Sequence, residues 1–524
     1  MKKHGKIILL ALLVYAVLLA LLVAAEAASP DASIRTLWDA VWFSLITMTT
    51  VGYGDLSPVT PAGRVLGLIF ALCSIGILSA LIGLGLHLIG GQLMPRLRLR
   101  LGRRRTWYVF HEENEDAAAL ASELRRGEKG CLIVFPAGGE KLLSGPELVR
   151  LSAESADLVR LRGGTEGLSM FFMGPNGWEN FGAGLEAAAL DLPAYCMADI
   201  ASDAVPPQLH LFARSECLSR CYWKEHPLRR EERRVVLIGC GGTGSALLER
   251  ALLTNVFEPG RCVEYHVFGD SADFAALHPG IVRALVPGTP GEDSLFLHGE
   301  PWSACPSVLR GADRIILCCD EDRENLELYE KLHTWFAPGA PIHIRLNAPL
   351  PQLDSFGGRE EIITREFVMK DAVNRCAVML NDIYNENAAH PAAWNELSYF
   401  LRQSNIAAAD HLIVKIRFLL DDDGITELTG DNCRRAWEVY RRVGGEQAEL
   451  LQEMEHRRWL RFHLLHNWEY APVRDNALRR HNLMVPYGEL NEEERRKDAY
   501  AWQLLGKLAE AYGAPPSPQT EQNT

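Results

Sequence analysis

The run TVGYG at residues 50–54, followed by Asp55, carries its potential chemistry in the backbone. Glycine at alternate positions permits backbone angles that a side chain would forbid, so successive carbonyl groups can all point to one side. Four copies around an axis would then stack rings of oxygen atoms that replace the water shell of a dehydrated cation. The residues expected to form these rings are Thr50, Val51, Gly52, Tyr53 and Gly54.

Two apolar stretches must position this run. Residues 7–25 and residues 65–93 carry no Asp, Glu, Lys or Arg, and each is long enough to cross a hydrocarbon core. Basic residues lie outside both stretches, while the loop between them is acidic. This asymmetry predicts a multi-pass protein of the inner (plasma) membrane with both termini in the cytoplasm. A signal peptide is the alternative for the first stretch, but its removal would leave the run without its first helix.

Between the two stretches, residues 36–49 form a short apolar segment that enters the membrane and returns as a pore helix. Trp42 is placed to donate an indole hydrogen bond to Asp55, and Tyr53 can pack outward, so we expect these side chains to brace the run. Together, residues 49–64 resemble the selectivity filter of K⁺ channels. The resemblance implies a homotetramer in a lipid bilayer, with K⁺ at the filter carbonyls as the only metal ion.

Three positions in this pore domain, residues 1–95, leave questions open. Ile46 stands where some relatives carry a carboxylate behind the filter, and Phe43 stands where a tryptophan is common, so filter bracing is expected to differ. Gly76 lies within the second apolar stretch. It is either a bending point of the gate or a site of close helix packing.

An arginine-rich linker, residues 96–105, follows and is expected to contact anionic lipid headgroups. Residues 107–110, 114–126 and 131–135 then read as strand, helix and strand, which favours a parallel sheet. After the first strand the chain has HEENED where a dinucleotide fold needs glycines, so a phosphate would meet carboxylates. We therefore expect residues 106–230 to form a Rossmann-like unit without a dinucleotide at the standard place.

A second unit, residues 231–364, contains GCGGTG between a predicted strand and a predicted helix. Gly239, Gly241 and Gly244 match the pattern of a tight turn that receives a pyrophosphate, and Asp270 falls where a ribose-binding acid is found. The predicted ligand is NAD(H) or another adenine nucleotide; the alternative is a nucleotide fold kept as a scaffold. Tandem units of this kind next to a K⁺ pore resemble RCK domains, the regulators of K⁺ conductance.

Residues 365–512 are predicted to be mainly helical, followed by a disordered tail at 513–524. The stretch 450–505 resembles the RyR domain, the repeat named after ryanodine receptors, through the motifs EHRRW, WEY and VPY. Aromatic faces and basic groups suit a nucleotide-like ligand, although buried tryptophans could equally form a core. The candidate ligand-binding residues are Trp459, Trp468, Tyr470, Arg474, His481 and Tyr487.

Charge and composition restrict the function further. The net charge is −13, although the first 105 residues carry about +7, so the acidic bulk argues against nucleic-acid binding. The 12 cysteines show no repeated spacing, which favours buried cytosolic thiols over disulfides or a zinc site. Nucleophile-elbow, HExxH and Walker-lysine motifs are lacking, so we do not expect an enzyme.

The sequence thus predicts a membrane all-α pore domain joined to two α/β Rossmann-like cytosolic units and a mainly α RyR-like domain. The expected function is a K⁺-selective channel controlled by a cytosolic nucleotide-like ligand. Two alternatives remain open: a membrane-anchored NAD-binding sensor or oxidoreductase, and a nucleotide-triggered defence effector whose pore harms its own cell. The sequence leaves undetermined the identity of the ligand, the sign of its effect and the unit that binds it.

Overall fold

The computed structural model describes residues 2–72, 93–138, 141–203, 205–289, 291–369, 374–386, 388 and 390–513. The chain divides into two compact units. One comprises Met1–Arg103 with Val149–Ser152, and the other comprises Arg104–Leu148 with Ala153–Thr524. The predicted hinge Gly76 and the predicted tail after Gly513 lie outside the described residues.

The first unit contains the long helix α1 (Lys2–Glu26), the short helix α2 (Leu37–Met48), a helical segment at residues 61–72 and α4 (Met94–Leu101). Helix α2 corresponds to the predicted pore helix, and Thr36 caps its first turn together with Asp39. Searching the described residues finds no helix whose length and hydropathy meet the requirements of a membrane span. Residues 73–92 of the second predicted span lie outside the described part of the chain.

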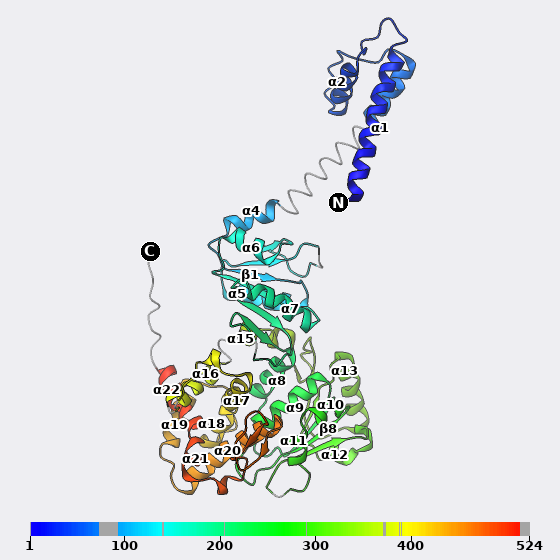
Figure 1. The fold of residues 1–524 in the computed structure, drawn as a ribbon. Helices are drawn as coiled ribbons and strands as arrows, with labels where there is room; N and C mark the ends of the chain where they lie inside the picture. The colour runs from blue at the N-terminus through cyan, green and yellow to red at the C-terminus, as the bar shows by residue number, and fades with distance from the viewer. Residues whose placement is uncertain are drawn as a thin grey trace. The chain divides into compact units, whose positions relative to one another are not determined.

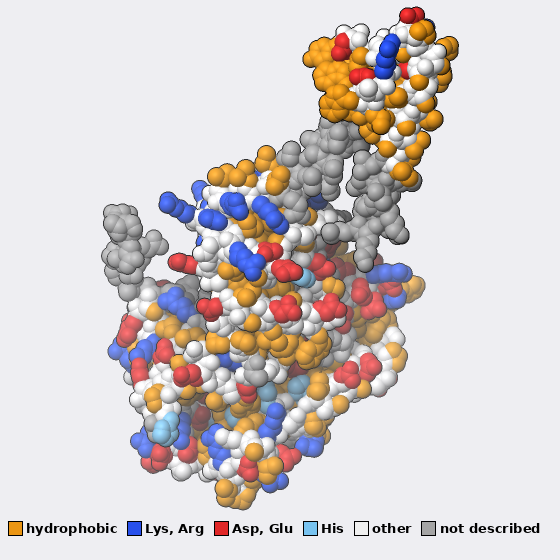
Figure 2. Space-filling model, turned by 45° about the horizontal axis from the view of Figure 1, so that its top comes forward, with side chains coloured by type: hydrophobic (Ala, Val, Ile, Leu, Met, Phe, Trp, Pro, Cys, Tyr) orange, Lys and Arg blue, Asp and Glu red, His pale blue; other side chains and the backbone are white. Residues whose placement is uncertain are grey.

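The connection between α1 and the segment 61–72 is held by Glu26, which is fully buried. Its carboxylate accepts hydrogen bonds from the amides of Val59 and Thr60, each at 3.0 Å, and from the Thr60 hydroxyl at 2.7 Å. Large apolar side chains are exposed along α1, on α2 and on the segment 61–72, and hydrophobic side chains dominate the face of this unit drawn in Figure 2.

The larger compact unit of the chain begins with the first of two α/β units, whose six-stranded sheet has the order β3-β2-β1-β4-β5-β6. Its strands are β1 (Trp107–Phe110), β2 (Leu132–Phe135), β3 (Leu148–Arg150), β4 (Leu168–Phe172), β5 (Ala194–Met197) and β6 (Leu209–Phe212). The helices are α5 (Glu115–Gly127), α6 (Ser155–Arg162), α7 (Gly177–Ala188) and α8 (Arg214–Glu225). The predicted parallel pairing of β1 with β2 is confirmed, and the strand order is that of a Rossmann fold.

A second sheet follows in the order β12-β11-β10-β7-β8-β9, which repeats the same topology and is parallel throughout. Its strands are β7 (Arg234–Ile238), β8 (Glu264–Phe268), β9 (Ser294–His298), β10 (Arg314–Leu317), β11 (Ile342–Arg345) and β12 (Ser355–Phe356). Its helices are α9 (Gly242–Thr254), α10 (Ala272–Leu277), α11 (Pro279–Ala284), η2 (Trp302–Ala304), α12 (Pro306–Arg310), α13 (Asp322–Lys331) and η3 (Leu332–Phe336).

The remaining chain is mainly helical, as predicted, and lies beside the second sheet (Figure 1). Its elements are α14 (Arg359–Ile362), α15 (Arg365–Met369), α16 (Arg375–Glu386), η4 (Trp394–Glu396), α17 (Tyr399–Asp410), α18 (Leu412–Leu420), α19 (Gly430–Tyr440), α20 (Glu446–Leu465), β13 (Glu469–Tyr470), β14 (Arg480–His481), η5 (Tyr487–Glu489), α21 (Glu492–Lys497) and α22 (Tyr500–Gly513). Helix α20 packs on α9 and α11, so the helical part is anchored to the glycine-rich unit.

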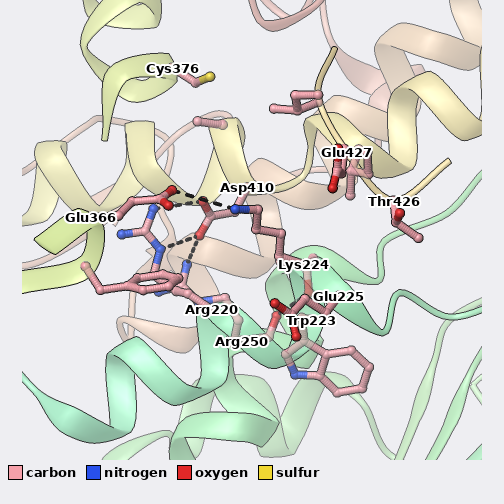
Figure 3. A pocket seen from close by; sticks show the side chains of 15 residues that line it. Arg220, Trp223, Lys224, Glu225, Arg250, Glu366, Cys376, Asp410, Thr426 and Glu427 are labelled. Atoms are coloured by element: carbon pink, nitrogen blue, oxygen red, sulfur yellow. Dashed lines mark hydrogen bonds and ion pairs between the residues drawn. The ribbon is translucent and has the colours of Figure 1, made fainter. Parts of the chain in front are cut away.

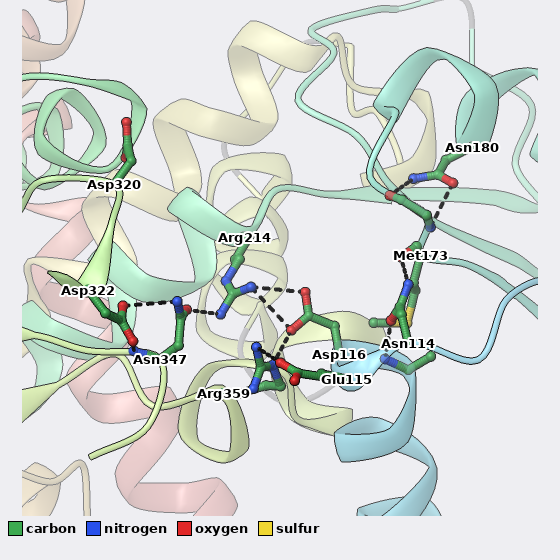
Figure 4. A network of polar contacts seen from close by, with 12 residues as sticks. Asn114, Glu115, Asp116, Met173, Asn180, Arg214, Asp320, Asp322, Asn347 and Arg359 are labelled. Atoms are coloured by element: carbon green, nitrogen blue, oxygen red, sulfur yellow. Dashed lines mark hydrogen bonds and ion pairs between the residues drawn. The ribbon is translucent and has the colours of Figure 1, made fainter. Parts of the chain in front are cut away.

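A polar network joins the two α/β units (Figure 4). Arg214 at the start of α8 contacts Asp116 of α5 at 3.0 Å and also donates to Asn347. Arg359 contacts the same Asp116 at 2.7 Å, while Asn347 binds Asp322 of the second sheet at 2.9 Å. The start of α5 is acidic and was predicted to be unsuited to a phosphate. Its Asp116 instead pairs with Arg214 and Arg359, and these contacts hold the two α/β units together.

Candidate functional site

The loop after α2 has an alternating backbone. The φ angle is positive at Thr50 (59°), Gly52 (57°) and Gly54 (73°), and at neither of the residues between them. The carbonyl of Ile46, which lacks a partner within the end of α2, accepts the amides of Val51 at 3.0 Å and Gly52 at 3.1 Å. The glycine pattern predicted this alternation, but the positive φ of Thr50 was not foreseen because β-branched residues rarely adopt it.

The Trp42 side chain contacts two residues of this loop, Asp55 and Tyr53. Trp42 Nε1 donates to Asp55 Oδ2 at 3.0 Å, which confirms the predicted hydrogen bond. The Tyr53 ring stacks on Trp42 with centroids 6.4 Å apart and planes 9° apart. Phe43 and Ile46, which depart from the K⁺-channel pattern, are both buried, so an apolar side chain fills the position of Ile46, where some relatives carry a carboxylate.

The glycine-rich turn of the second sheet has the predicted strand-turn-helix form. At Gly239, where φ is 110°, an added Cβ would lie 2.6 Å from the backbone nitrogen of Cys319. At Gly244 it would lie 2.1 Å from the carbonyl oxygen of Gly239. Both positions therefore require glycine for the tight turn and for the close approach of α9 to the strand.

A carboxylate already occupies the backbone amides that would bind a phosphate at the end of this turn. Asp320, just after β10, accepts the amide of Gly242 at 3.1 Å and that of Thr243 at 2.9 Å. A Cβ at Gly241 would lie 2.2 Å from the same carboxylate. These are the amides at the start of α9 that a pyrophosphate would use, so a dinucleotide at this place would first have to displace Asp320.

The surroundings of the turn are also acidic. Asp270, the predicted ribose acid, is exposed and accepts the amide of Ala272 at 3.2 Å. The charged residues that line a cavity of about 380 Å³ beside Gly241 are four carboxylates, Asp199, Glu216, Glu249 and Asp273, and one arginine, Arg250. Burial, reinforced by Glu216 and Glu249, raises the pKa of Asp199 in this cavity. Negative charge at this density opposes the binding of a phosphate.

A third candidate ligand site is a cavity of about 490 Å³ within the helical part, which we call the RyR-like cavity. Helices α16, α17, α20 and α21 and the loop after β14 contribute its walls. Three of the predicted RyR-domain residues, Trp459, Arg474 and His481, line this cavity together. The rings of Trp459 and His481 meet edge to face at 5.1 Å. An aromatic wall beside cationic side chains is suited to a flat, anionic ligand.

The other three predicted residues lie elsewhere. Trp468 is buried and stacks on Phe400 with centroids 5.3 Å apart, so it belongs to the core. Tyr487 is also buried and donates its hydroxyl to Gln452 at 3.0 Å. Tyr470 is exposed on the short strand β13. Sequence spacing alone did not separate the aromatic residues of the cavity from those that support it.

The turn before Trp468 keeps a glycine-like conformation. Asn467 precedes Trp468 with a φ of 59°, a value that asparagine tolerates better than most residues. Its side-chain amide donates to the carbonyl of Leu277 at 2.7 Å and its oxygen accepts the amide of Gly280 at 3.3 Å. Asn467 therefore ties the helical part to the second α/β unit.

Buried charges lie beneath this cavity. Glu455 bonds Lys415 at 2.6 Å and Arg458 at 2.7 Å. Although burial opposes ionisation, these two cations lower the pKa of Glu455 to about 2. Burial, with the charge of Glu455, raises the pKa of Asp498 to about 8. Asp498 Oδ2 has no hydrogen-bond partner among the described residues, although His456 Nδ1 lies 3.7 Å away, and Asp498 is one of the residues that line the cavity.

A further cavity, of about 610 Å³, lies between α8, α9 and the helical part (Figure 3). Asp410 bonds Arg220 at 2.9 Å and Arg250 at 3.1 Å across it. Because Asp410 already pairs with both arginines, these cations are less available to an anionic ligand than Arg474 in the cavity that contains Trp459. Arg474 bonds the neutral Asn476.

Comparison with known proteins identifies two segments. Residues 7–89 match the family model described as ion channel, and residues 445–514 match the RyR domain. The voltage-gated potassium channel of Aeropyrum pernix is 47% identical over 58 residues, which are 11% of this chain and 20% of that protein. Potassium voltage-gated channel subfamily A member 5 of Oryctolagus cuniculus is 31% identical over 142 residues, 26% of this chain and 21% of that protein.

Solved structures of the GsuK channel are also similar. The structure bound to ADP covers 68% of this chain and 96% of that chain at 15% identity and a TM-score of 0.32. The structure bound to NAD covers 73% and 86% at 11% identity and the same TM-score. The aligned stretches span about a fifth of the curated potassium channels. The resemblance of the N-terminal segment to ion channels and of the C-terminal segment to RyR domains is thus confirmed.

Proposed function

We propose that this protein is a K⁺-selective channel, a homotetramer whose conduction is controlled by a nucleotide-like ligand bound in the RyR-like domain. The observation that carries the pore assignment is the alternation of φ at Thr50, Gly52 and Gly54. Such a backbone turns the carbonyls of residues 50–53 to one side, where fourfold repetition would surround a dehydrated K⁺ with oxygen. The match of residues 7–89 to ion channels supports the assignment.

We place the controlling ligand in the 490 Å³ cavity rather than at the glycine-rich turn. Asp320 occupies the amides of the turn, whereas the cavity offers the Trp459 ring, the Arg474 guanidinium and the Asp498 carboxyl group beside His456. A base stacked on Trp459 and a phosphate near Arg474 would use both kinds of contact. Binding would control the pore to the extent that it favours one gate state over the other.

The pore assignment is tested by K⁺ flux from liposomes that contain the full-length protein. Gly52→Ala places a side chain at φ 57°, where nothing lies within 4 Å of the new Cβ. The substitution therefore costs about 1–2 kcal/mol through the backbone alone. We expect flux to be lost while the remaining chain stays folded. Gly182→Ala, also in open space but without a positive φ, is the matched control. Retained K⁺-selective flux in Gly52→Ala would refute the assignment.

The ligand assignment is tested in the same liposomes with a panel of adenine and guanine nucleotides and dinucleotides. We expect the response to the active compound to be lost in Trp459→Ala and weakened in Arg474→Gln. Trp335→Ala removes a tryptophan that is 78% exposed and lies outside the cavity, so its response should be unchanged. An active nucleotide whose effect survives Trp459→Ala but is lost in Gly241→Val would instead place the ligand at the glycine-rich turn.

A further inference from the structure

Three side chains with metal-binding atoms meet at the end of the edge strand β9. His298 ends the strand, Glu300 follows in the next turn and Cys305 is the N-cap residue just before α12. His298 Nδ1 lies 3.5 Å from Glu300 Oε1, and Cys305 Sγ lies 3.4 Å from the same oxygen. All three atoms lie within 4.8 Å of one another, and within the described residues they form the one such group.

These separations match those between the ligands of a tetrahedral zinc ion. Zinc binds imidazole nitrogen and carboxylate oxygen at about 2.0–2.2 Å and thiolate sulfur at about 2.3 Å, which places neighbouring ligand atoms roughly 3.3–3.7 Å apart. The two distances that involve Glu300 already fall in this range. The remaining distance, from His298 Nδ1 to Cys305 Sγ, needs to close by about 1 Å at most.

The ring of His298 is fixed from behind. His266 Nδ1 lies 2.9 Å from His298 Nε2, so one ring donates to the other. If His298 donates from Nε2, its Nδ1 carries a lone pair directed at Glu300 and Cys305. His266 would then carry its proton on Nε2, which lies 3.7 Å from Glu264. The His298 ring also stacks on Phe268 with centroids 4.2 Å apart. Metal-binding histidines are usually held through their second nitrogen by a carboxylate, a backbone carbonyl or water, and here the His266 ring takes that place.

We propose that His298, Glu300 and Cys305 bind one Zn²⁺ per chain, with water in the fourth position. One thiolate, one imidazole and one carboxylate form a ligand set that selects a borderline metal over Mg²⁺ or Ca²⁺. The thiol proton of Cys305 leaves when the metal binds. The ion would link the end of β9 to the start of α12 and so fix the intervening turn. This site is independent of the pore and of the RyR-like cavity.

The sequence showed none of the usual zinc signatures, because a single cysteine and a single histidine stand seven residues apart in H-G-E-P-W-S-A-C. The partner that orients His298 comes from the neighbouring strand β8, and only the sheet brings the two histidines together.

The test uses the full-length protein in detergent after removal of metal with a chelator. Titration with Co²⁺, followed by its thiolate charge-transfer absorbance, and with Zn²⁺, followed by calorimetry, should each saturate at one equivalent. Binding should release about one proton from the thiol and raise the melting temperature. Cys305→Ser should abolish the charge-transfer absorbance, whereas Cys262→Ser, which removes another partly buried thiol of the same α/β unit, should leave it intact.

The role of His266 in orienting the His298 ring has its own readout. His266→Gln should weaken Zn²⁺ binding by roughly 10–100-fold while the Co²⁺-thiolate absorbance persists at saturation, because the ligands themselves remain. Failure to saturate at one equivalent would overturn the proposal. Saturable binding that Cys305→Ser and His298→Gln leave unchanged would equally overturn it, since the metal would then lie elsewhere.

Discussion

The buried ion triad beneath the RyR-like cavity predicts a large stability effect. Lys415, Glu455 and Arg458 are 0%, 2% and 1% exposed, and both cations bond the one carboxylate. Glu455→Gln keeps the volume of the side chain but leaves two buried cations without a counter-charge. Removing one partner of a buried ion pair typically costs about 3–5 kcal/mol. For a helical part of this size, we expect the melting temperature to fall by roughly 6–20 °C.

The same part of the chain offers a matched control. Glu386 and Lys507 form an ion pair at 2.8 Å between side chains that are 56% and 45% exposed. Glu386→Gln makes the same chemical change at the surface, where such pairs contribute at most about 1 kcal/mol. Thermal unfolding of the detergent-solubilised protein, followed by tryptophan fluorescence, measures both variants. Equal melting temperatures for Glu455→Gln and Glu386→Gln would refute the conclusion that Lys415 and Arg458 depend on Glu455 for their counter-charge.

Three further predictions concern the other sites. Asp320→Asn removes a negative charge from the amides at the start of α9, so calorimetry should show NAD(H) or ADP binding at least about tenfold tighter than in the unchanged protein; unchanged affinity would mean that Asp320 does not control this turn. Burial lowers the pKa of His463 to about 3 and that of His481 to about 4, so the folded state binds fewer protons and stability should fall as the pH drops below about 6.5. Asp498, with its pKa raised to about 8, binds more protons when folded between about pH 4 and 8, so it lowers stability by about 1.4 kcal/mol per unit as the pH rises through this window. Below pH 6.5 the two histidines outweigh this effect, so unfolding midpoints should peak near pH 6.5, and Asp498→Asn should abolish the alkaline loss and steepen the acid loss. Trp42→Phe deletes the hydrogen bond to Asp55 but keeps the ring, so patch recordings should show K⁺ currents that decay faster during sustained opening, and a time course like that of the unchanged protein would exclude a bracing role.

Local patterns sufficed for much of the fold. Short apolar runs predicted strands β1 and β2, and the glycine spacing predicted the turn before α9. Glycine at positions 52 and 54 indicated an unusual backbone because few other residues tolerate its angles. These features are encoded by neighbouring residues, so a single sequence can reveal them.

The sequence alone did not predict which residues come together at each site. Asp320 reaches the glycine-rich turn from a strand about 80 positions later, and His266 meets His298 from the adjacent strand. Of six aromatic or polar residues predicted in the RyR-like domain, only three line the cavity, and Asp498 was not foreseen among its lining residues. Periodicity tells which residue types recur, but the burial of a given side chain depends on elements packed against it from distant parts of the chain.

The sequence by itself determined the backbone that could coordinate an ion and the order of the domains, because both follow from short-range rules of conformation and hydropathy. Tertiary structure alone decided which charges face one another. It turned Asp320 toward the amides of α9, placed Glu455 between two cations and gathered His298, Glu300 and Cys305 at one sheet edge. Electrostatic interactions depend on distance in space rather than along the chain, and that distance is set only when the sheets and helices have packed.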